Sequence, residues 1–291
     1  MIPPSFDYYS PSSFSEAVKL LAELGEDARL IAGGQSLLPM LKLRLIRPKA
    51  IIDLFKVKGL SHIREKGRYL QIGSLTTERS IERSPLIRKG CPVLSEAASH
   101  IGDIHIRNLG TVGGSLCHAD PSADLAPTLL ALGATFTVKS IKGSRVIDSR
   151  DFFAGPYMTH LSSNEILSQI QVPKFNRDTS GAYVKLMRKA GDFAIIGAAV
   201  VLHLDQRGEC QQCSIALCGA APWPVLSERG SQVLLGSRLT DVEIARASEL
   251  AKNDADPISD IHASAEYRRE MIPVIVSRAL RQAKERLGGG A

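Results

Sequence analysis

The chain has 291 residues, of which 44% are hydrophobic and 23% are charged, and its formal net charge is +6. This length supplies ample core for a globular protein of one to three units. Nucleic-acid-binding proteins use a basic stripe with stacking aromatic side chains, whereas here the basic residues are scattered and only 5% of residues are aromatic. The composition therefore argues against a nucleic-acid partner.

The opening residues, Met1 to Pro4, do not form the charged and apolar regions of a signal peptide. The longest apolar run, residues 194–202, is far shorter than the roughly 20 residues that span a bilayer. We therefore expect a cytoplasmic protein that does not span a membrane. Five cysteines fit reduced thiols, and the Cys210–Cys213 pair has no second pair or histidines at ligand spacing, so no metal site is expected.

Residues 1–58 favour a small unit in which helices and strands alternate. Ser13 and Glu16 have the spacing of a capping box and open a helix that Gly25 ends. Three further elements are predicted in this unit: a strand over 29–32, a helix over 37–45 and a strand over 50–54.

Residues 59–175 favour a second unit of mixed helices and strands. Strands are predicted over 69–73, 135–138, 145–147 and 166–172, and helices over 76–80, 93–100 and 125–132. A polar stretch over 174–180 marks the boundary to a third unit, residues 176–291. Its predicted elements are strands over 182–188, 194–204 and 213–217, a helix over 241–252 and a final helix that contains Pro273, with residues 288–291 frayed.

Two segments share an unusual glycine pattern. The first glycine segment is Ala32-Gly-Gly-Gln-Ser36, and the second runs from Gly110 to Ser115 with the sequence Gly-Thr-Val-Gly-Gly-Ser. Glycine lets backbone N–H groups approach a ligand closely, and successive N–H groups form a concavity for anions. Neither segment fits the dinucleotide fingerprint or the P-loop pattern, so a Rossmann or P-loop fold is not supported. The pair suggests a diphosphate held mainly by backbone.

Read together, these segments and their surroundings resemble the FAD-binding medium subunits of the xanthine oxidase, or molybdenum hydroxylase, family. The nearest types are the medium subunits of carbon monoxide dehydrogenase and of quinoline 2-oxidoreductase. The resemblance covers essentially the whole chain. Besides the two glycine segments, it rests on five stretches: Met1–Tyr8, Gly25–Arg29, Ile104–Asn108, Arg188–Ala194 and Ala265–Arg268.

The resemblance implies an α+β fold. A two-lobed FAD-binding domain of the vanillyl-alcohol-oxidase (PCMH) type would fill 1–58 and 59–175. A C-terminal flavoprotein domain with a three-stranded sheet and a helical bundle would fill 176–291. It also implies an oxidoreductase subunit that transfers electrons without substrate chemistry of its own. A large subunit with a molybdenum-pterin would oxidise the substrate, a small subunit with two [2Fe–2S] clusters would pass electrons on, and FAD in this chain would deliver them to an external acceptor. The complex would be a dimer of heterotrimers.

The resemblance also implies a set of cofactor-binding residues. The first glycine segment with its flanking residues and the second glycine segment would hold the diphosphate, Asp124 would hydrogen-bond FAD, and the remaining residues would line its apolar or isoalloxazine end. The full set is Ile31, Ala32, Gly33, Gly34, Gln35, Ser36, Leu37, Ile101, Gly110, Thr111, Val112, Gly113, Gly114, Ser115, Asp124, Leu167, Lys185 and Phe193.

This sequence departs from the carbon monoxide enzymes at three positions of the pattern. Gln35 stands where they have His, Ser115 where they have Asn, and Phe193 where they have Tyr. Gln and Ser still donate hydrogen bonds, so FAD binding is expected, whereas carbon monoxide as the substrate is not implied. Flavin oxidases of this fold that attach FAD covalently use a histidine in the first segment, so Gln35 predicts non-covalent FAD.

The residues taken alone leave other interpretations open. Lys185 would be a solvated lysine on a strand face, Leu167 and Phe193 would be core residues, and Asp124 would cap the following helix. Isolated glycine pairs are commonly turns. No residue is expected to be catalytic, because His105 and His118 have no paired carboxylate or nucleophile at a meaningful spacing.

Two other functions remain as alternatives. The chain would act directly on a small organic substrate as a stand-alone FAD-dependent oxidoreductase, or it would be a scaffold that has lost FAD. The first lacks an acid–base pair that can be placed over the flavin. The second conflicts with two intact glycine segments and with Asp124.

Overall fold

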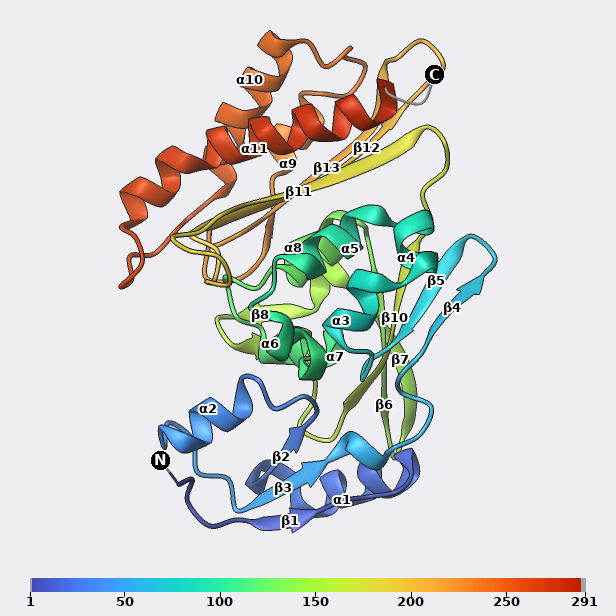
Figure 1. Ribbon diagram of the computed structural model, residues 1–291, viewed down its shortest axis with the longest axis vertical. Coiled ribbons are helices and arrows are strands. Elements are labelled where there is room, and N and C mark those ends of the chain that lie inside the picture. Colours follow the sequence, from blue (N-terminus) through green and yellow to red (C-terminus); the bar gives the residue numbers. More distant parts are fainter. Residues whose placement is uncertain (1, 289–291) are drawn as a thin grey trace.

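The computed structural model describes residues 2–288. Of the expected fraying at 288–291, Gly288 is instead the last residue of a helix, and 289–291 lie outside the described residues. The chain forms three units, each built around its own β-sheet and stacked along the long axis of Figure 1. Its mixed helices and sheets match the expected α+β class. Among the described residues, no helix has both the length and the apolar character needed to cross a membrane.

The first unit is a three-stranded parallel sheet in the order β1-β3-β2. Its elements are β1 (Asp7–Tyr9), α1 (Phe14–Leu24), β2 (Ala28–Ile31), α2 (Leu37–Lys42) and β3 (Ala50–Asp53). The predicted capping box forms only by half: the Ser13 side chain accepts from the Glu16 amide, but the Glu16 carboxylate binds the amide of Ser12 instead. Helix α2 ends before the predicted residue 45, and Arg44 turns the chain with a φ of 60°.

The second unit has a five-stranded antiparallel sheet in the order β4-β5-β10-β6-β7. Its strands are β4 (Ile63–Lys66), β5 (Tyr69–Gly73), β6 (Thr135–Ser140), β7 (Gly143–Asp148) and β10 (Ile166–Pro173), with a separate hairpin of β8 (Phe153–Gly155) and β9 (Met158–Thr159). Its helices are α3 (Glu78–Arg83), α4 (Pro85–Gly90), α5 (Pro92–Ser99), α6 (Ile104–Leu109), α7 (Val112–His118) and α8 (Leu125–Ala131).

The third unit begins with three long antiparallel strands, as expected, and a short fourth strand extends the sheet in the order β11-β12-β13-β14. The strands are β11 (Thr179–Leu186), β12 (Ile196–Leu204), β13 (Cys210–Cys218) and β14 (Val225–Leu226). The helices are α9 (Glu228–Gln232), α10 (Asp241–Ala251) and α11 (Ala265–Gly288), and Pro273 lies inside α11. Short 3-10 turns complete the chain: η1 (Gly25–Asp27), η2 (Leu54–Lys56), η3 (Ser149–Asp151) and η4 (Lys252–Asp254).

The sheet of the third unit is buried on both faces. Successive side chains of a strand point to opposite faces. Ala182 and Val200 pack with the helices α10 and α11, whereas Tyr183 and Ala199 belong to the core of the second unit. Helices α5 and α8 lie between this sheet and the rest of the second unit (Figure 1). Polar side chains of β11 on this face therefore meet the second unit rather than solvent.

The second glycine segment is not the loop that its composition indicates. Residues from Val112 onward form α7, and the hydroxyl of Thr111 caps it by accepting from the amide of Gly114 at 3.1 Å. Glycine disfavours a helix by about 1 kcal/mol per residue relative to alanine. The cap and the tertiary packing of this turn outweigh that preference.

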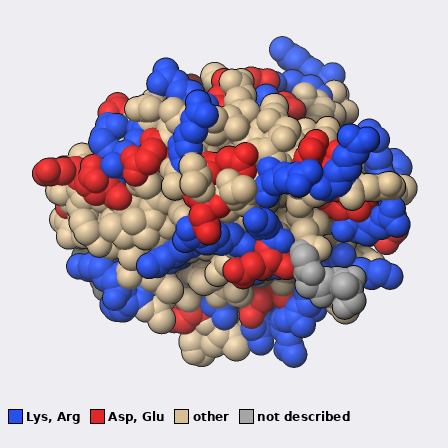
Figure 2. Space-filling view, turned by 90° about the horizontal axis from the view of Figure 1, so that it is seen from above, with Lys and Arg blue, Asp and Glu red and all other residues tan. Residues whose placement is uncertain are grey.

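The surface over α10 and α11 carries charges of both signs side by side, with no large block of one sign (Figure 2). Several of these side chains form ion pairs, including Arg281 with Asp241 at 3.0 Å and Lys252 with Glu270 at 3.1 Å. This face is an ordinary solvated surface.

Candidate functional site

A cavity of about 470 Å³ lies between the first and second units, and residues 191–193 of the third unit contribute to its wall. In Figure 1 it corresponds to the region where α2 and the chain after β2 face α6 and α7. The wall contains fifteen of the predicted cofactor-binding residues: Ala32, Gly33, Gly34, Gln35, Ser36, Leu37, Ile101, Gly110, Thr111, Gly113, Gly114, Ser115, Asp124, Leu167 and Phe193.

Three predicted residues do not line the cavity. Ile31 ends β2 directly before the first glycine segment, and Val112 is fully buried in the core of the second unit. The side chain of Lys185 is also fully buried, so the alternative of a solvated lysine is wrong. These three residues lie behind the wall that their neighbours form.

The first glycine segment leaves its backbone donors free. Among residues 2–288, the N–H groups of Gly33 to Leu37 have no hydrogen-bond acceptor. The segment is held by its carbonyl groups instead: the Gly34 oxygen accepts from Leu38 at 3.0 Å, and the Gly33 oxygen accepts from the Gln35 side chain at 3.3 Å. Gly34 has a φ of +73°, a conformation in which residues with a Cβ are strained. Free N–H groups facing a cavity are suited to an anionic ligand.

The second glycine segment uses its backbone donors inside the protein. The amide of Val112 donates to Thr76 at 3.1 Å, and that of Gly113 donates to Ser74 at 2.9 Å. The amides of Gly114 and Ser115 both donate to Thr111, at 3.1 Å and 2.9 Å. The expectation that backbone groups of this segment are available to a diphosphate is therefore corrected for residues 112–115. What remains for a ligand is the Thr111 amide, which has no acceptor among the described residues, and the hydroxyl groups.

The glycines of both segments are required by close packing within the protein. A Cβ on Gly33 would overlap the carbonyl oxygen of Leu109. A Cβ on Gly110 would lie 2.7 Å from the Glu78 carboxylate, and one on Gly113 would lie 2.7 Å from atoms of Ser74. The glycine pattern predicts close approach of a ligand, whereas at these three positions the glycines bring the two segments and their neighbours into contact.

Asp124 joins the second unit to the third. Its carboxylate accepts from the Tyr183 hydroxyl at 2.6 Å and from the Lys185 ammonium at 2.9 Å, and Lys185 also donates to the His100 carbonyl at 3.0 Å. Burial raises the pKa of Asp124, and Lys185 and Tyr183 oppose this rise. The Asp124 side chain makes no capping bond to α8, so the alternative role as a helix cap is wrong. The buried Lys185 ammonium is thus paired with Asp124.

Glu78 is a buried carboxyl group in the cavity wall. It is 4% exposed, and its Oε2 atom has no hydrogen-bond partner among the described residues. Burial raises its pKa to about 8, the nearby Asp124 adds to the rise, and Arg107 opposes it. An unpaired buried oxygen costs free energy. Because Oε2 is enclosed, the other carboxyl oxygen, Oε1, is the candidate for contact with a ligand.

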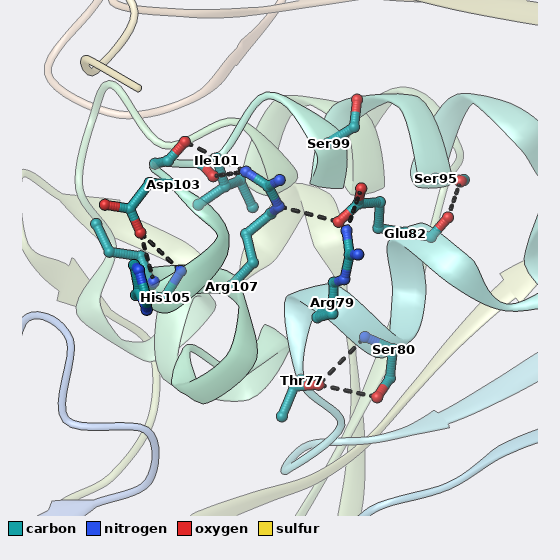
Figure 3. A network of polar contacts seen from close by, with 12 residues as sticks. Thr77, Arg79, Ser80, Glu82, Ser95, Ser99, Ile101, Asp103, His105 and Arg107 are labelled. Carbon is teal, nitrogen blue, oxygen red and sulfur yellow. Dashed lines mark hydrogen bonds and ion pairs between the residues drawn. The ribbon is translucent and has the colours of Figure 1, made fainter. Parts of the chain in front are cut away.

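Arg107 fixes part of the apolar wall (Figure 3). Its Nε donates to Glu82 on α3 at 2.9 Å, and its NH1 group donates to the carbonyls of Ile101 at 2.8 Å and Gly102 at 3.2 Å. Glu82 is also bound by Arg79 at 2.8 Å. This network holds the Ile101–Gly102 turn against the cavity.

Two aromatic residues mark other parts of the wall. Phe193 is 54% exposed, so the interpretation of a core residue is wrong, whereas Leu167 is both core and cavity wall at 3% exposed. Tyr157 has a φ of 58°, and its hydroxyl donates to Asp120 at 3.4 Å. Burial lowers the pKa of the adjacent His118, and Asp120 opposes this. His118 also lines the cavity, although no role is expected for it from the sequence.

Eighteen lining residues were not predicted. They are Arg29, Leu30, Met40, Ile46, Leu54, Ser74, Leu75, Glu78, Gly102, Ile106, Cys117, His118, Asp120, Ala123, Tyr157, Ile166, Gly191 and Asp192. Several flank predicted positions, so adjacency to the glycine segments is the signal that would have found them. Glu78 has no such signal, because its sequence context is that of an ordinary first helical turn.

Comparison with known proteins identifies the family. Residues 4–175 match the FAD binding domain in molybdopterin dehydrogenase, which is more than half of the chain. The chain belongs to this family. Residues 181–283 match the CO dehydrogenase flavoprotein C-terminal domain. The boundary between the two matches falls at the polar stretch before β11.

Relatives match over nearly the full chain. The carbon monoxide dehydrogenase medium chain of Hydrogenophaga pseudoflava is 40% identical over 283 residues, which is 97% of this chain and 98% of that one. Subunit alpha of the 6-hydroxypseudooxynicotine dehydrogenase complex of Paenarthrobacter nicotinovorans is 38% identical over 286 residues, covering 98% and 97%.

Solved structures agree with the same family. A carbon monoxide dehydrogenase structure from Hydrogenophaga pseudoflava has a TM-score of 0.96 at 40% identity, covering 98% of this chain and 99% of that one. Quinoline 2-oxidoreductase from Pseudomonas putida 86 has a TM-score of 0.92 at 34% identity, covering 98% and 99%. The resemblance and fold class expected from sequence are confirmed.

The chain is accordingly an FAD-binding subunit of an oxidoreductase, and its own cofactor is FAD. The molybdenum and iron–sulfur groups of homologous complexes belong to other subunits. The cavity has the donor set that this cofactor needs: free amides for a diphosphate, polar side chains for hydroxyl groups, and apolar side chains for ring systems. The residues present therefore fit FAD.

Proposed function

We propose that the chain is the electron-transfer subunit of a cytoplasmic molybdenum hydroxylase. Electrons from substrate oxidation at molybdenum in a large subunit would pass through [2Fe–2S] clusters of a small subunit to this chain, which delivers them to an external acceptor. The complex is a dimer of heterotrimers. The observation that carries the proposal is the cavity, which lies against both glycine segments and presents unpaired amides.

We assign the diphosphate of FAD to the amides of residues 33–37, with the hydroxyls of Thr111 and Ser115 as further donors. Backbone amides oriented toward one point hold an anion without the flexibility of a lysine side chain. Ile31 and Val112 support these segments from behind the wall. Because no histidine occupies the first segment, FAD is held non-covalently.

The isoalloxazine ring is assigned to the part of the wall with Ile101, Leu167 and Phe193. Ile101 and Leu167 exclude water from one side, and the exposed Phe193 lies where it controls access of the acceptor. Asp124 hydrogen-bonds FAD, and Lys185 acts on FAD through Asp124. When bound, FAD supplies a centre that exchanges electrons singly or in pairs. The chain contributes binding, orientation and exclusion of water.

The test is a visible spectrum and metal analysis of the protein purified from its host without dissociation of its complex. The proposal predicts one FAD per chain of this type, with iron and molybdenum in co-purifying chains and a native mass that corresponds to two copies of each subunit. A lone chain with flavin, no metals and direct reduction by an organic substrate would contradict the proposal and favour the stand-alone oxidoreductase.

A further inference from the structure

The carboxyl group of Glu78 lies beside the contact between the two glycine segments. An added Cβ on Gly110 would meet Glu78 Oε2, and one on Gly33 would meet the backbone at Leu109 and Gly110. Glu78 is 4% exposed and lines the cavity, and its Oε2 atom has no partner among the described residues. The amide of Glu78 donates to the Gly110 carbonyl at 2.9 Å, which fixes the residue in this place. Oε2 is enclosed by the protein, so Oε1 is the carboxyl oxygen that can reach the cavity and the assigned diphosphate position.

The charges around Glu78 favour its neutral form. Burial raises its pKa to about 8, Asp124 adds to this rise, and Arg107 on α6 opposes it. Arg107 is itself paired with Glu82, and Glu82 also binds Arg79 of the same helix. Arg83, in the last turn of α3, is not among the charges that shift the pKa of Glu78.

Among the cations on the elements packed against α3, Arg107 is the one that acts on the pKa of this carboxyl group; Lys89, at the end of α4, does not. On α5, Glu96 pairs with Arg286 at 2.7 Å, and on α4 the Arg88 side chain donates to the Glu82 carbonyl at 3.0 Å. On α7, burial lowers the pKa of His118, which favours its neutral form, and His105 on α6 lies beside the Asp103 cap. Bound diphosphate would add negative charge and raise the pKa of Glu78 further.

A protonated carboxyl group has one O–H donor, which an ionised one lacks. An ionised Glu78 next to a diphosphate would be repelled, because two like charges at short range in a partly buried site interact strongly. The neutral form would instead donate from Oε1 to an acceptor in the cavity, because Oε2 is enclosed against Gly110. The phosphate oxygens are the acceptors assigned to this side of the cavity.

We propose that Glu78 binds FAD as a neutral acid whose O–H group donates a hydrogen bond to a phosphate oxygen of the cofactor. This inference rests on the proposed function, because it places the FAD diphosphate between the two glycine segments. Its consequence is that FAD binding takes up a proton wherever free Glu78 is ionised. Affinity for FAD should then fall as pH rises above the pKa of the free protein.

The experiment measures FAD binding by the full chain, freed of FAD, between pH 6 and pH 10. The variants are Glu78→Gln, which keeps an N–H donor without titrating, and Glu78→Leu, which has no donor. Glu23→Gln serves as the matched control, because Glu23 is exposed on α1. Calorimetry in buffers of different ionisation enthalpy gives the protons taken up per FAD bound. Unfolding temperatures of all variants establish that each one folds.

For the wild type and the control we expect a constant Kd below about pH 7 and a rise of roughly tenfold per pH unit above about pH 8, with about one proton taken up per FAD at pH 9. For Glu78→Gln, the Kd for FAD should change less than about twofold over the same pH range, after correction for any titration of FAD itself. This variant should bind FAD without proton uptake. Glu78→Leu should bind about tenfold more weakly at pH 7.

Two results would overturn the inference, and they differ from one another. If the wild type and Glu78→Gln bind FAD with the same pH dependence and proton uptake, Glu78 does not contact the diphosphate as an acid, while the proposed function stands. If the wild-type chain binds no FAD at any pH, the proposed function fails and the role of Glu78 fails with it.

Discussion

The two glycine segments are similar in sequence, but their backbone amides have different roles in the structure. The first leaves the amides of residues 33–37 free at the cavity. The second becomes the start of α7 and donates its amides to Ser74, Thr76 and Thr111. The first segment is thus built to bind, whereas the second is built to hold the wall in place and to offer hydroxyl groups.

A glycine pattern therefore does not by itself indicate a phosphate loop. At Gly33, Gly110 and Gly113, a Cβ would meet backbone or carboxylate atoms of the protein itself. These glycines let two units approach closely enough to enclose a cavity between them. The binding groups follow from that contact and not from the glycines alone.

The largest expected effect concerns Asp124, which follows the second glycine segment in the chain and pairs with Lys185. The change Asp124→Asn leaves the fully buried Lys185 without its counter-charge, and breaking a buried pair in this way costs about 3–5 kcal/mol of unfolding free energy. Denaturant unfolding measures this loss. In the double variant with Lys185→Met we expect the cost to be smaller than the sum of the two single changes. Additive costs would contradict the pairing.

The packing role of the glycines is tested by Gly33→Ala. Its new Cβ would overlap the Leu109 carbonyl, so we expect a loss of about 3 kcal/mol and much weaker FAD binding. Gly155→Ala is the matched control, because its Cβ would find only ordinary contacts with Met158. Equal stability of both variants in a thermal melt would mean that Gly33 is not needed for contact between the segments.

Glu78 links the two segments and gives an effect that depends on pH. Its pKa of about 8 lies above the ordinary value of 4.5, so the folded state keeps a proton that the unfolded state releases between these values. Stability therefore falls as pH rises through this window, and the penalty is fully present above pH 8.

Glu78→Gln removes this penalty. Each pKa unit is worth about 1.4 kcal/mol, and a partly unpaired buried amide costs about 1–3 kcal/mol at either pH. We therefore expect a net gain of about 2 kcal/mol at pH 8 and a net loss of about 1–3 kcal/mol at pH 4.5. Denaturant unfolding at both pH values checks this. A gain that is the same at both would show that Glu78 does not titrate in this window.

The smallest effect concerns the cap of α7. Thr111→Val removes the oxygen that accepts from Gly114, and loss of such a cap costs about 1 kcal/mol. FAD binding should weaken with it, because the hydroxyl is also an assigned donor. Thr137→Val is the comparison, because Thr137 is a half-buried strand residue on β6 where no helix cap is lost. An unchanged FAD affinity in Thr111→Val would remove this hydroxyl from the site.

Much of the architecture follows from local sequence signals. The strands over 69–73 and 166–172, the helix that begins at Pro92 and the helix over 241–252 lie close to their predicted positions, because apolar periodicity and caps are local properties. The overall arrangement of the units came from the family resemblance rather than from these patterns.

Other features depend on contacts between distant residues, which local patterns do not encode. Lys185 reads as a solvated strand residue until β11 brings it to Asp124, 61 residues away. The sequence around Glu78 predicts a surface helix residue, whereas in the structure Gly110 packs on its carboxylate. Helix α7 contradicts the low helix propensity of glycine because Ser74 and Thr76 accept from its first turn.

The central claim is that FAD occupies the cavity with its diphosphate on the first glycine segment. Hydrogen–deuterium exchange of the full chain with and without FAD tests it most directly. We predict strong slowing of amide exchange over residues 33–37, where donors are free, and little change over 112–115, where they are already bonded. Bound FAD with unchanged exchange over 33–37 would contradict the account.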